Sequence, residues 1–304
     1  MYKSYITIVF IFSSVLISSF NSQLNNIILS AEGQQQQQQS SISSSTKNVT
    51  DLIKTNDKNS SIVLENKTVN YFDNTNGYLV YPTSTSSLGD NNNVSANNNK
   101  LPAVVMIHEW WGLNENIKDM AESLAREGYV VLAVDLYKGQ VANTTDLAQH
   151  LVGKARENPS EATNNLQYAV RYLASLDNVN SSKIASLGWC FGGGQSLQLA
   201  LNTEPEYPLA GTIIYYGNLI SDPESISKIK WPVLGIFGDK DQSISVDSVK
   251  QFEEALNAKK IPNQIYIYKG VGHAFANPSG DNYAPQETQD AWEKTVSFLK
   301  NYLK

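Results

Sequence analysis

The chain has 304 residues, and its 23 Lys and Arg against 29 Asp and Glu give a formal net charge of −6. This acidic balance excludes a simple basic nucleic-acid-binding protein, so we expect no nucleic-acid partner. Hydrophobic residues make up 41% of the chain, which is enough for a sizeable core. The single Cys excludes an intramolecular disulfide. Three His and one Cys, all far apart in the sequence, leave no zinc-ligand spacing, so we expect no metal site.

The N-terminus has the pattern of an export signal. Lys3 precedes an apolar run, Tyr5 to Phe20, that is short for a membrane-spanning helix. We interpret residues 1–22 as a cleavable signal peptide. The alternative is an uncleaved anchor that would tether the protein to a membrane. Residues 23–58 contain six consecutive Gln and a Ser-rich stretch, a composition that predicts a disordered tether.

Sequons for N-glycosylation are frequent, although Asn-rich stretches also produce them by chance. Together with the leader they favour an extracellular or cell-surface protein. They begin at Asn48, Asn59, Asn66, Asn93, Asn143 and Asn180.

A single folded domain is expected over residues 59–304. Residues 62–82 have the pattern of antiparallel strands with a break at Asn76-Gly77. The polar insert Gly89 to Lys100 predicts a surface loop. The pattern then changes at Pro102 to His108, an unbroken apolar run typical of a parallel strand that is buried on both faces.

Strand-like and helical segments alternate after that run. Further strands are expected at 129–134, 184–187, 210–215, 233–237 and 264–268. A further helix is expected to start at Ser196. Four other helices are indicated by apolar residues at helical spacing: Ile117, Met120, Ala121 and Leu124; Leu166, Ala169, Val170 and Leu173; Val249, Phe252 and Leu256; and Trp292, Val296, Leu299 and Leu303. The alternation predicts an α/β fold with a mostly parallel central sheet, helices on both faces and antiparallel N-terminal strands.

The sharpest motif is GWCFGGG, residues 188–194, between strand-like IASL and helical QSLQLAL. Its G-x-C-x-G spacing is that of a nucleophile elbow, in which Gly on both sides lets the chain turn so sharply that the central side chain projects above the sheet edge. Cys190 is then a catalytic nucleophile, active as a thiolate. The alternative is a small buried hydrophobic residue, which the oxidation liability of a lone exported thiol disfavours.

A base and an acid that match this nucleophile follow in the chain. His273 comes just after strand-like NQIYIY, whereas His108 precedes the nucleophile and His150 falls in a polar stretch. The acid is expected after residues 233–237, where Asp239 and Asp241 compete. We prefer Asp241, which would fix the tautomer of His273, while the other Asp would cap a turn.

The first parallel strand ends in His108-Glu109-Trp110-Trp111, at the loop that supplies an oxyanion N–H in hydrolases with such an elbow. The backbone N–H groups of Trp110 and Phe191 would form the oxyanion pair. Glu109 would lie beside the nucleophile and handle a proton, or else be a strand-end residue hydrogen-bonded to a loop. The two Trp side chains line a pocket or belong to the core.

Taken in order over residues 60–304, these motifs resemble those of the dienelactone hydrolase family of α/β-hydrolases. HEWWGLN resembles its E-x-x-G-x-N loop, Asp135-Leu136-Tyr137 its D-L-Y strand end, GWCFGGG its G-x-C-x-G-G elbow, Gly238-x-x-Asp241 its acid loop, and GHAF its G-H-x-F. The resemblance implies an α/β-hydrolase fold, a triad of Cys190, Asp241 and His273, and a Glu109 that holds and deprotonates the thiol. We expect no cofactor.

One departure from the family pattern concerns the substrate. Members that act on dienelactone clamp its carboxylate with arginines, yet Asn277 follows GHAFA, and only Lys154 and Arg156 offer weak substitutes for the other arginine. We therefore predict a hydrolase of small carboxylic esters or lactones that prefers neutral substrates. We expect the protein to be a monomer. Its substrate pocket is assigned to Trp111, Tyr137 and Asn277.

The alternative from another class is a non-catalytic cell-surface binding module on the same fold, which an intact triad disfavours. A papain-type cysteine protease lacks support, because neither its local Cys signature nor its Cys-His-Asn order occurs in the chain.

Overall fold

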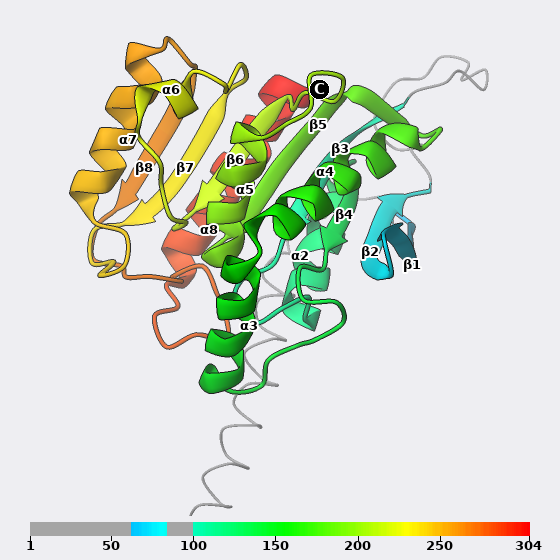
Figure 1. Ribbon diagram of the computed structural model, residues 1–304, viewed down its shortest axis with the longest axis horizontal. Helices are drawn as coiled ribbons and strands as arrows, with labels where there is room; N and C mark the ends of the chain where they lie inside the picture. The colour runs from blue at the N-terminus through cyan, green and yellow to red at the C-terminus, as the bar shows by residue number, and fades with distance from the viewer. Residues whose placement is uncertain (1–61, 84–99) are drawn as a thin grey trace, which may run out of the picture. The chain divides into compact units, whose positions relative to one another are not determined.

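The computed structural model describes residues 62–83 and 100–304 (Figure 1). The apolar N-terminal run, the Gln-rich segment, nearly all of the polar insert and the sequons at Asn48, Asn59 and Asn93 lie outside these residues, so those inferences stay predictions. In the described ranges, no helix combines the length and the apolar character needed to cross a membrane.

The strands of the described residues form one eight-stranded sheet in the order β1-β2-β4-β3-β5-β6-β7-β8. β1 pairs antiparallel with β2, and β2 with β4, whereas all other neighbours are parallel. This confirms the predicted mostly parallel sheet with antiparallel N-terminal strands. The strands are β1 (Leu64–Phe72), β2 (Thr75–Pro82), β3 (Leu101–Ile107), β4 (Val130–Val134), β5 (Val179–Trp189), β6 (Gly211–Tyr215), β7 (Val233–Gly238) and β8 (Asn263–Tyr268).

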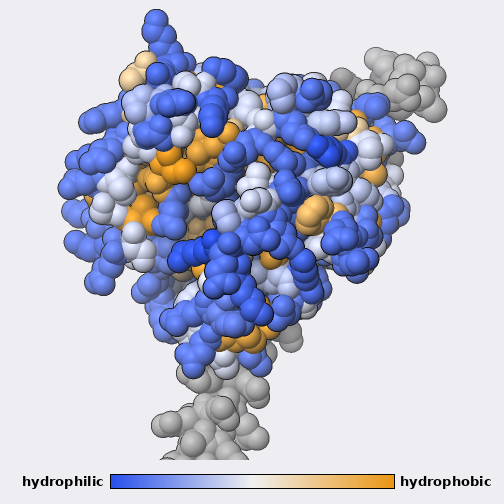
Figure 2. Space-filling view, viewed as in Figure 1, coloured by the Kyte–Doolittle hydropathy of each residue, from blue (hydrophilic) through white to orange (hydrophobic). Residues whose placement is uncertain are grey.

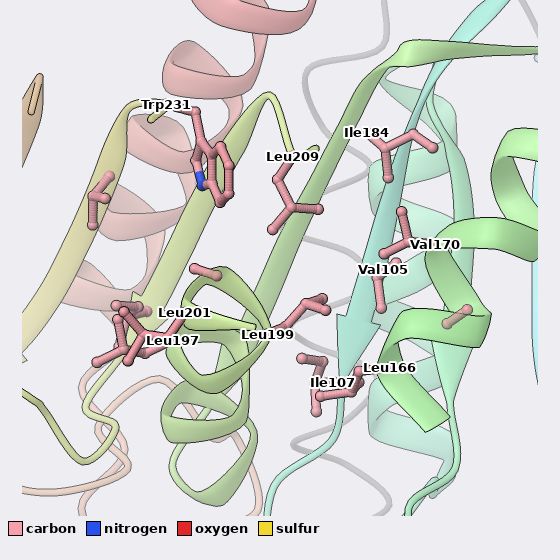
Figure 3. Close-up of a cluster of buried hydrophobic side chains, with 14 of the residues drawn as sticks. Val105, Ile107, Leu166, Val170, Ile184, Leu197, Leu199, Leu201, Leu209 and Trp231 are labelled. Carbon is pink, nitrogen blue, oxygen red and sulfur yellow. The ribbon is translucent and has the colours of Figure 1, made fainter. Parts of the chain in front are cut away.

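Helices cover both faces of the sheet, as predicted (Figure 1). They are α2 (Glu115–Arg126), α3 (Thr145–Glu157), α4 (Pro159–Ser175), α5 (Phe191–Leu201), α6 (Pro223–Ile226), α7 (Val246–Ala258) and α8 (Pro285–Leu303). Along β3, Val105 and Ile107 pack into a core shared with α4, α5 and α7, part of which Figure 3 shows. Val104 and Met106 point to the opposite face, where α2 and α8 pack. Hydrophilic side chains cover most of the face viewed in Figure 2.

The first hairpin turns at a different place from the one predicted. The chain reverses at Asp73-Asn74, with Asp73 at φ 44°, and Asn76-Gly77 lies inside β2. Gly77 is needed there for packing: a Cβ on it would lie 2.9 Å from the Ala133 carbonyl oxygen of β4. The Asn-Gly pair therefore reflects close approach of two strands and not a turn.

Two helices also differ from the prediction. α5 begins at Phe191, directly after the elbow, and not at Ser196. α3 was not predicted, because only Ala148, Leu151 and Val152 are buried and most of its other side chains are polar. Such a narrow apolar stripe gives a weak amphipathic signal.

The carboxyl ends of the parallel strands meet at one edge of the sheet. Ile107 of β3 is in register with Gly188 of β5, and Trp189 with Tyr215 of β6. The loops after β3, β5, β6, β7 and β8 consequently emerge side by side. In open α/β sheets this is the edge at which ligands bind.

The buried face of α8 gives a test of the fold. The sequence pattern placed Val296 on that face, but Val296 is only half-buried, whereas Phe298 is 1% exposed in the core between α8 and the sheet. We expect Phe298→Ala to lower the free energy of unfolding by about 3–5 kcal/mol and Val296→Ala by about 1 kcal/mol or less. Urea denaturation measures both, and equal losses would contradict this packing.

Candidate active site

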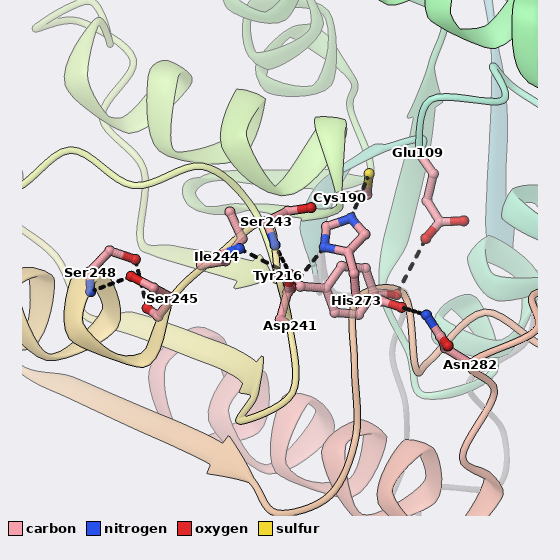
Figure 4. Close-up of polar contacts among 10 residues, drawn as sticks. All are labelled: Glu109, Cys190, Tyr216, Asp241, Ser243, Ile244, Ser245, Ser248, His273 and Asn282. Atoms are coloured by element: carbon pink, nitrogen blue, oxygen red, sulfur yellow. Dashed lines mark hydrogen bonds and ion pairs between the residues drawn. The ribbon is translucent and has the colours of Figure 1, made fainter.

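Cys190 lies in the turn between β5 and α5 with φ 54° and ψ −116°, a backbone conformation that L-residues rarely adopt. Its N–H donates to the Tyr215 carbonyl at 3.0 Å and fixes the turn to β6. Neighbouring positions have no room for a side chain: a Cβ on Gly188 would collide with the Gly192 carbonyl, and one on Gly192 with the His108 carbonyl. The Cys190 side chain projects from this turn toward His273 (Figure 4).

Three of the predicted residues form one chain of contacts. His273 Nε2 lies 3.1 Å from Cys190 Sγ, and His273 Nδ1 lies 2.8 Å from Asp241 Oδ2 (Figure 4). The Asp241 side chain is fully buried, and that of His273 is 27% exposed. Because the three residues follow β5, β7 and β8, the parallel sheet brings them together from distant parts of the sequence.

The charge state of this group follows from its contacts. Burial acts to lower the pKa of His273, but its hydrogen bonds to Asp241 and Cys190 and their negative charges outweigh burial and raise that pKa to about 10. Burial acts to raise the pKa of Asp241. Hydrogen bonds from His273 and from two backbone N–H groups outweigh burial and hold this pKa below its ordinary value. At neutral pH the imidazole is therefore protonated and can donate a proton from Nε2.

The two competing aspartates have different partners. Asp241 Oδ1 accepts hydrogen bonds at 2.7 and 3.0 Å from two backbone N–H groups of the following turn, which leaves Oδ2 for His273. Asp239 Oδ1 accepts from the Gly270 N–H at 2.6 Å and ties the loop after β7 to the end of β8. The imidazole contact thus belongs to Asp241, and Asp239 has a loop contact.

Glu109, just beyond β3, is 5% exposed and makes no hydrogen bond to Cys190 in the described part of the chain. Its Oε2 accepts from Asn277 Nδ2, and its Oε1 accepts from the Tyr216 hydroxyl at 3.3 Å. Burial raises the pKa of Glu109 to about 7, against the smaller lowering effects of the His273 charge and these two bonds. In place of the expected contact with Glu109, the sulfur faces His273.

Asn277 is hydrogen-bonded to Glu109 and lines a small cavity beside it. Its side chain is buried, with the amide nitrogen directed at Glu109 and Oδ1 accepting from the Ser279 N–H at 2.9 Å. The assignment of Asn277 to the substrate pocket stays a prediction, and its contacts show that it also holds Glu109.

Two residues that the sequence analysis left out of the site hold its loops. His108 is fully buried: Nδ1 donates to the Glu109 carbonyl at 2.5 Å and Nε2 accepts from the Leu136 N–H at 3.1 Å. One neutral tautomer satisfies both bonds, and burial lowers its pKa. Tyr216, at φ 35°, packs its ring edge-on against His273 with centroids 5.2 Å apart. His108 was visible in the HEWW motif, but no sequence signal marks Tyr216.

Aromatic side chains form a cluster that includes Cys190. Trp110 and Trp111 are half-buried, with ring centroids 5.0 Å apart, and Tyr137 stacks on Phe191 with centroids 5.7 Å apart. Both Trp pack against this cluster, and their assignment to a pocket wall stays a prediction. As the first residue of α5, Phe191 has a backbone N–H without an intrahelical acceptor, and the Trp110 N–H lies in the loop after β3.

The loop after β4, which carries Tyr137, is held by Asp135. One carboxylate oxygen accepts from the Tyr137 N–H at 2.7 Å, and the other accepts from the Gly139 N–H. The Asp135 carbonyl accepts from Asn165 Nδ2 of α4 at 3.0 Å. The Asp of the D-L-Y motif thus sets the position of the Tyr side chain.

The basic groups considered as substitutes for the arginines lie on α3. Arg156 is exposed, yet its charge acts on the Tyr137 hydroxyl: burial raises the pKa of that phenol, and Arg156 opposes the rise. Lys154 and His150 are exposed on the same helix. Across residues 62–83 and 100–304, no three His, Cys, Asp or Glu side chains are grouped so that they could hold a metal ion.

Comparison with known proteins identifies the family of this chain. A family model described as "Dienelactone hydrolase family" matches residues 92–303. The chain is 35% identical to a Saccharolobus solfataricus protein over 66% of this chain and 90% of that protein, and 32% identical to an Aquifex aeolicus protein over 67% and 89%. Both carry the name "Putative carboxymethylenebutenolidase". A solved structure from Klebsiella pneumoniae, described as "Putative Dienelactone Hydrolase", shares the fold at 23% identity, with a TM-score of 0.67 over 80% of this chain and 100% of that one.

The contacts of the two aspartates predict different effects on His273. Asp241→Asn should lower the pKa of His273 from about 10 toward its ordinary value, because the bond to Asp241 is the largest contribution that raises it. The control variant Asp239→Asn should leave this pKa unchanged. NMR titration of the imidazole resonances measures it, and the opposite ranking would assign the acid to Asp239.

Proposed function

Since the chain belongs to the dienelactone hydrolase family, we propose that it hydrolyses carboxylic esters or lactones through a Cys190–His273–Asp241 triad. The observation that carries this proposal is the continuous contact from sulfur to imidazole to carboxylate, with the sulfur presented on a strained elbow. A nucleophile, a base and a group that orients the base in this geometry are what acyl transfer requires.

The reaction begins from the thiolate–imidazolium pair. The Cys190 sulfur attacks the carbonyl carbon of the ester, and the negative charge that develops on the carbonyl oxygen is stabilised by the N–H groups of Trp110 and Phe191. The C–O bond to the leaving alkoxide then breaks, and the alkoxide takes the proton of His273. A thioester on Cys190 and a free alcohol result; for a lactone, the alcohol stays attached to the acyl group.

The second half of the reaction uses the same groups in reverse. Neutral His273 accepts a proton from a water molecule, whose oxygen attacks the thioester carbon. The carbon–sulfur bond breaks, which releases the carboxylic acid and restores the thiolate beside the imidazolium. Asp241 keeps Nδ1 of His273 as the donor throughout, so that Nε2 faces the reacting atoms.

Glu109 acts on this cycle through charge. The charge of His273 lowers the pKa of Glu109, and by reciprocity an ionised Glu109 stabilises the imidazolium. Its contacts with Asn277 and Tyr216 direct the carboxylate away from the sulfur, so His273 is the group that receives the thiol proton in this arrangement.

The substrate class follows from the position that Asn277 occupies. Its amide is engaged by Glu109, and it brings no positive charge to the pocket. A substrate carboxylate would lose the charge-assisted bidentate contact that an arginine gives. Neutral esters or lactones are therefore the preferred substrates.

The nucleophile is tested by substitution at Cys190. Cys190→Ala should abolish hydrolysis of p-nitrophenyl acetate while thermal unfolding stays nearly unchanged, and Cys190→Ser should retain little activity because the hydroxyl is a poorer nucleophile. Wild-type turnover by Cys190→Ala would refute the mechanism. An inactive wild-type protein that still binds esters would favour the binding-module alternative.

The pH dependence has a defined sign. Activity, as kcat/KM, should fall as pH rises above about 10, where His273 loses the proton that it gives to the leaving alkoxide. Asp241→Asn should move this fall to lower pH, because the bond to Asp241 is the largest contribution that raises the pKa of His273. A variant profile whose alkaline limb stays at the wild-type pH would show that another group causes it.

Substrate preference is tested with two substrates in one preparation. A neutral activated ester should have a higher kcat/KM than dienelactone. If dienelactone is faster, the neutral-substrate prediction is wrong, and Arg156→Gln identifies whether the Arg156 charge is responsible. Asn277→Arg should raise activity on the anionic substrate alone, provided that the contacts of His273 are kept.

A further inference from the structure

Tyr137 carries a buried hydroxyl without a partner. Its side chain is 4% exposed, and the hydroxyl makes no hydrogen bond with any described residue. Only one other described side chain, Tyr129, shares this property. Leaving a buried hydroxyl unpaired costs about 1–3 kcal/mol, so Phe would be the better residue at position 137 for stability alone.

The surroundings of Tyr137 hold the ring in place. It contacts Phe191, with centroids 5.7 Å apart, and His108, with centroids 4.7 Å apart, and these two rings also contact each other, with centroids 6.2 Å apart. Its backbone N–H donates to Asp135, and its carbonyl accepts from the Gln140 N–H at 3.2 Å. These ring contacts and the fixed backbone hold the Tyr137 side chain in place.

The Tyr137 ring lies next to the nucleophile, since it stacks on Phe191, the residue after Cys190. After burial, the charge of Cys190 is the next largest influence that raises the pKa of the Tyr137 phenol, and the charge of Arg156 lowers it less. The Tyr137 ring and Cys190 also belong to the same packed cluster. The phenol therefore stays protonated over the working range of pH and is a hydrogen-bond donor beside the nucleophile.

We propose that the Tyr137 hydroxyl donates a hydrogen bond to an oxygen of the ester or lactone bound at Cys190, and so completes its own bonding only in the complex. This inference rests on the proposed function and adds a catalytic residue to it. The Tyr137 ring is held by the bond from its backbone N–H to Asp135 and by its contacts with Phe191 and His108. Tyr129, by contrast, immediately precedes β4 and packs against Lys304. The proposal gives it no contact with the substrate.

The experiment compares Tyr137→Phe with the matched control Tyr129→Phe. Tyr137→Phe should lower kcat/KM for p-nitrophenyl acetate about 10- to 100-fold, with an unchanged or higher Tm because an unpaired buried hydroxyl is removed. Tyr129→Phe loses the same kind of group and should keep wild-type kcat/KM. Wild-type kcat/KM in Tyr137→Phe would overturn the proposal.

A second measurement separates an effect on the substrate from an effect on the nucleophile. Alkylation of Cys190 by iodoacetamide reports the reactivity of the sulfur, and its rate and pH profile should be the same in Tyr137→Phe and wild type. A loss of alkylation as large as the loss of hydrolysis would overturn the proposal, because the phenol would then act on Cys190. Cys190→Ala, assayed alongside, tests the proposed function separately. Hydrolysis by this variant would refute the proposed function, whatever the result for Tyr137→Phe.

Discussion

Cys190 adopts a left-handed backbone conformation that costs an L-residue about 1–3 kcal/mol, and the surrounding structure leaves the chain no other path. The turn is fixed to β6 by the Cys190 N–H, and Gly188 and Gly192 admit no side chain because backbone carbonyls fill the space. The strain is offset by the packing of β5 and α5 into the core. As a result of this turn, the Cys190 sulfur projects at the edge of the sheet beside His273. The other groups of the site surround that sulfur.

Charge is the second organising factor. His273 gains its raised pKa from Asp241 and Cys190, whereas Glu109 has its pKa raised because burial is not compensated by a cation in contact. A neutral amide, Asn277, holds Glu109 where an arginine would have given it a permanent positive partner. With a neutral amide as its partner, Glu109 keeps a pKa that burial raises to about 7.

The sequence predicted those parts of the fold that depend on local pattern. Unbroken apolar runs marked the parallel strands, and the glycines around Cys190 marked the elbow. The order of elbow, acid loop and GHAF was enough to select Asp241 and His273. The hairpin turn was misplaced because Gly77 serves strand packing. α3 was missed because its apolar stripe is narrow. The contacts that Glu109 makes depend on loops meeting across the sheet edge, which no local pattern encodes.

The most direct test of this account is detection of the covalent intermediate. The protein is mixed with a slowly hydrolysed activated ester, quenched in acid and digested, and the peptides are analysed by mass spectrometry. The account predicts an added acyl mass on the peptide that contains Cys190, present during turnover and lost as substrate is exhausted. Turnover with no acyl group on Cys190, or with the acyl group on another residue, would contradict it.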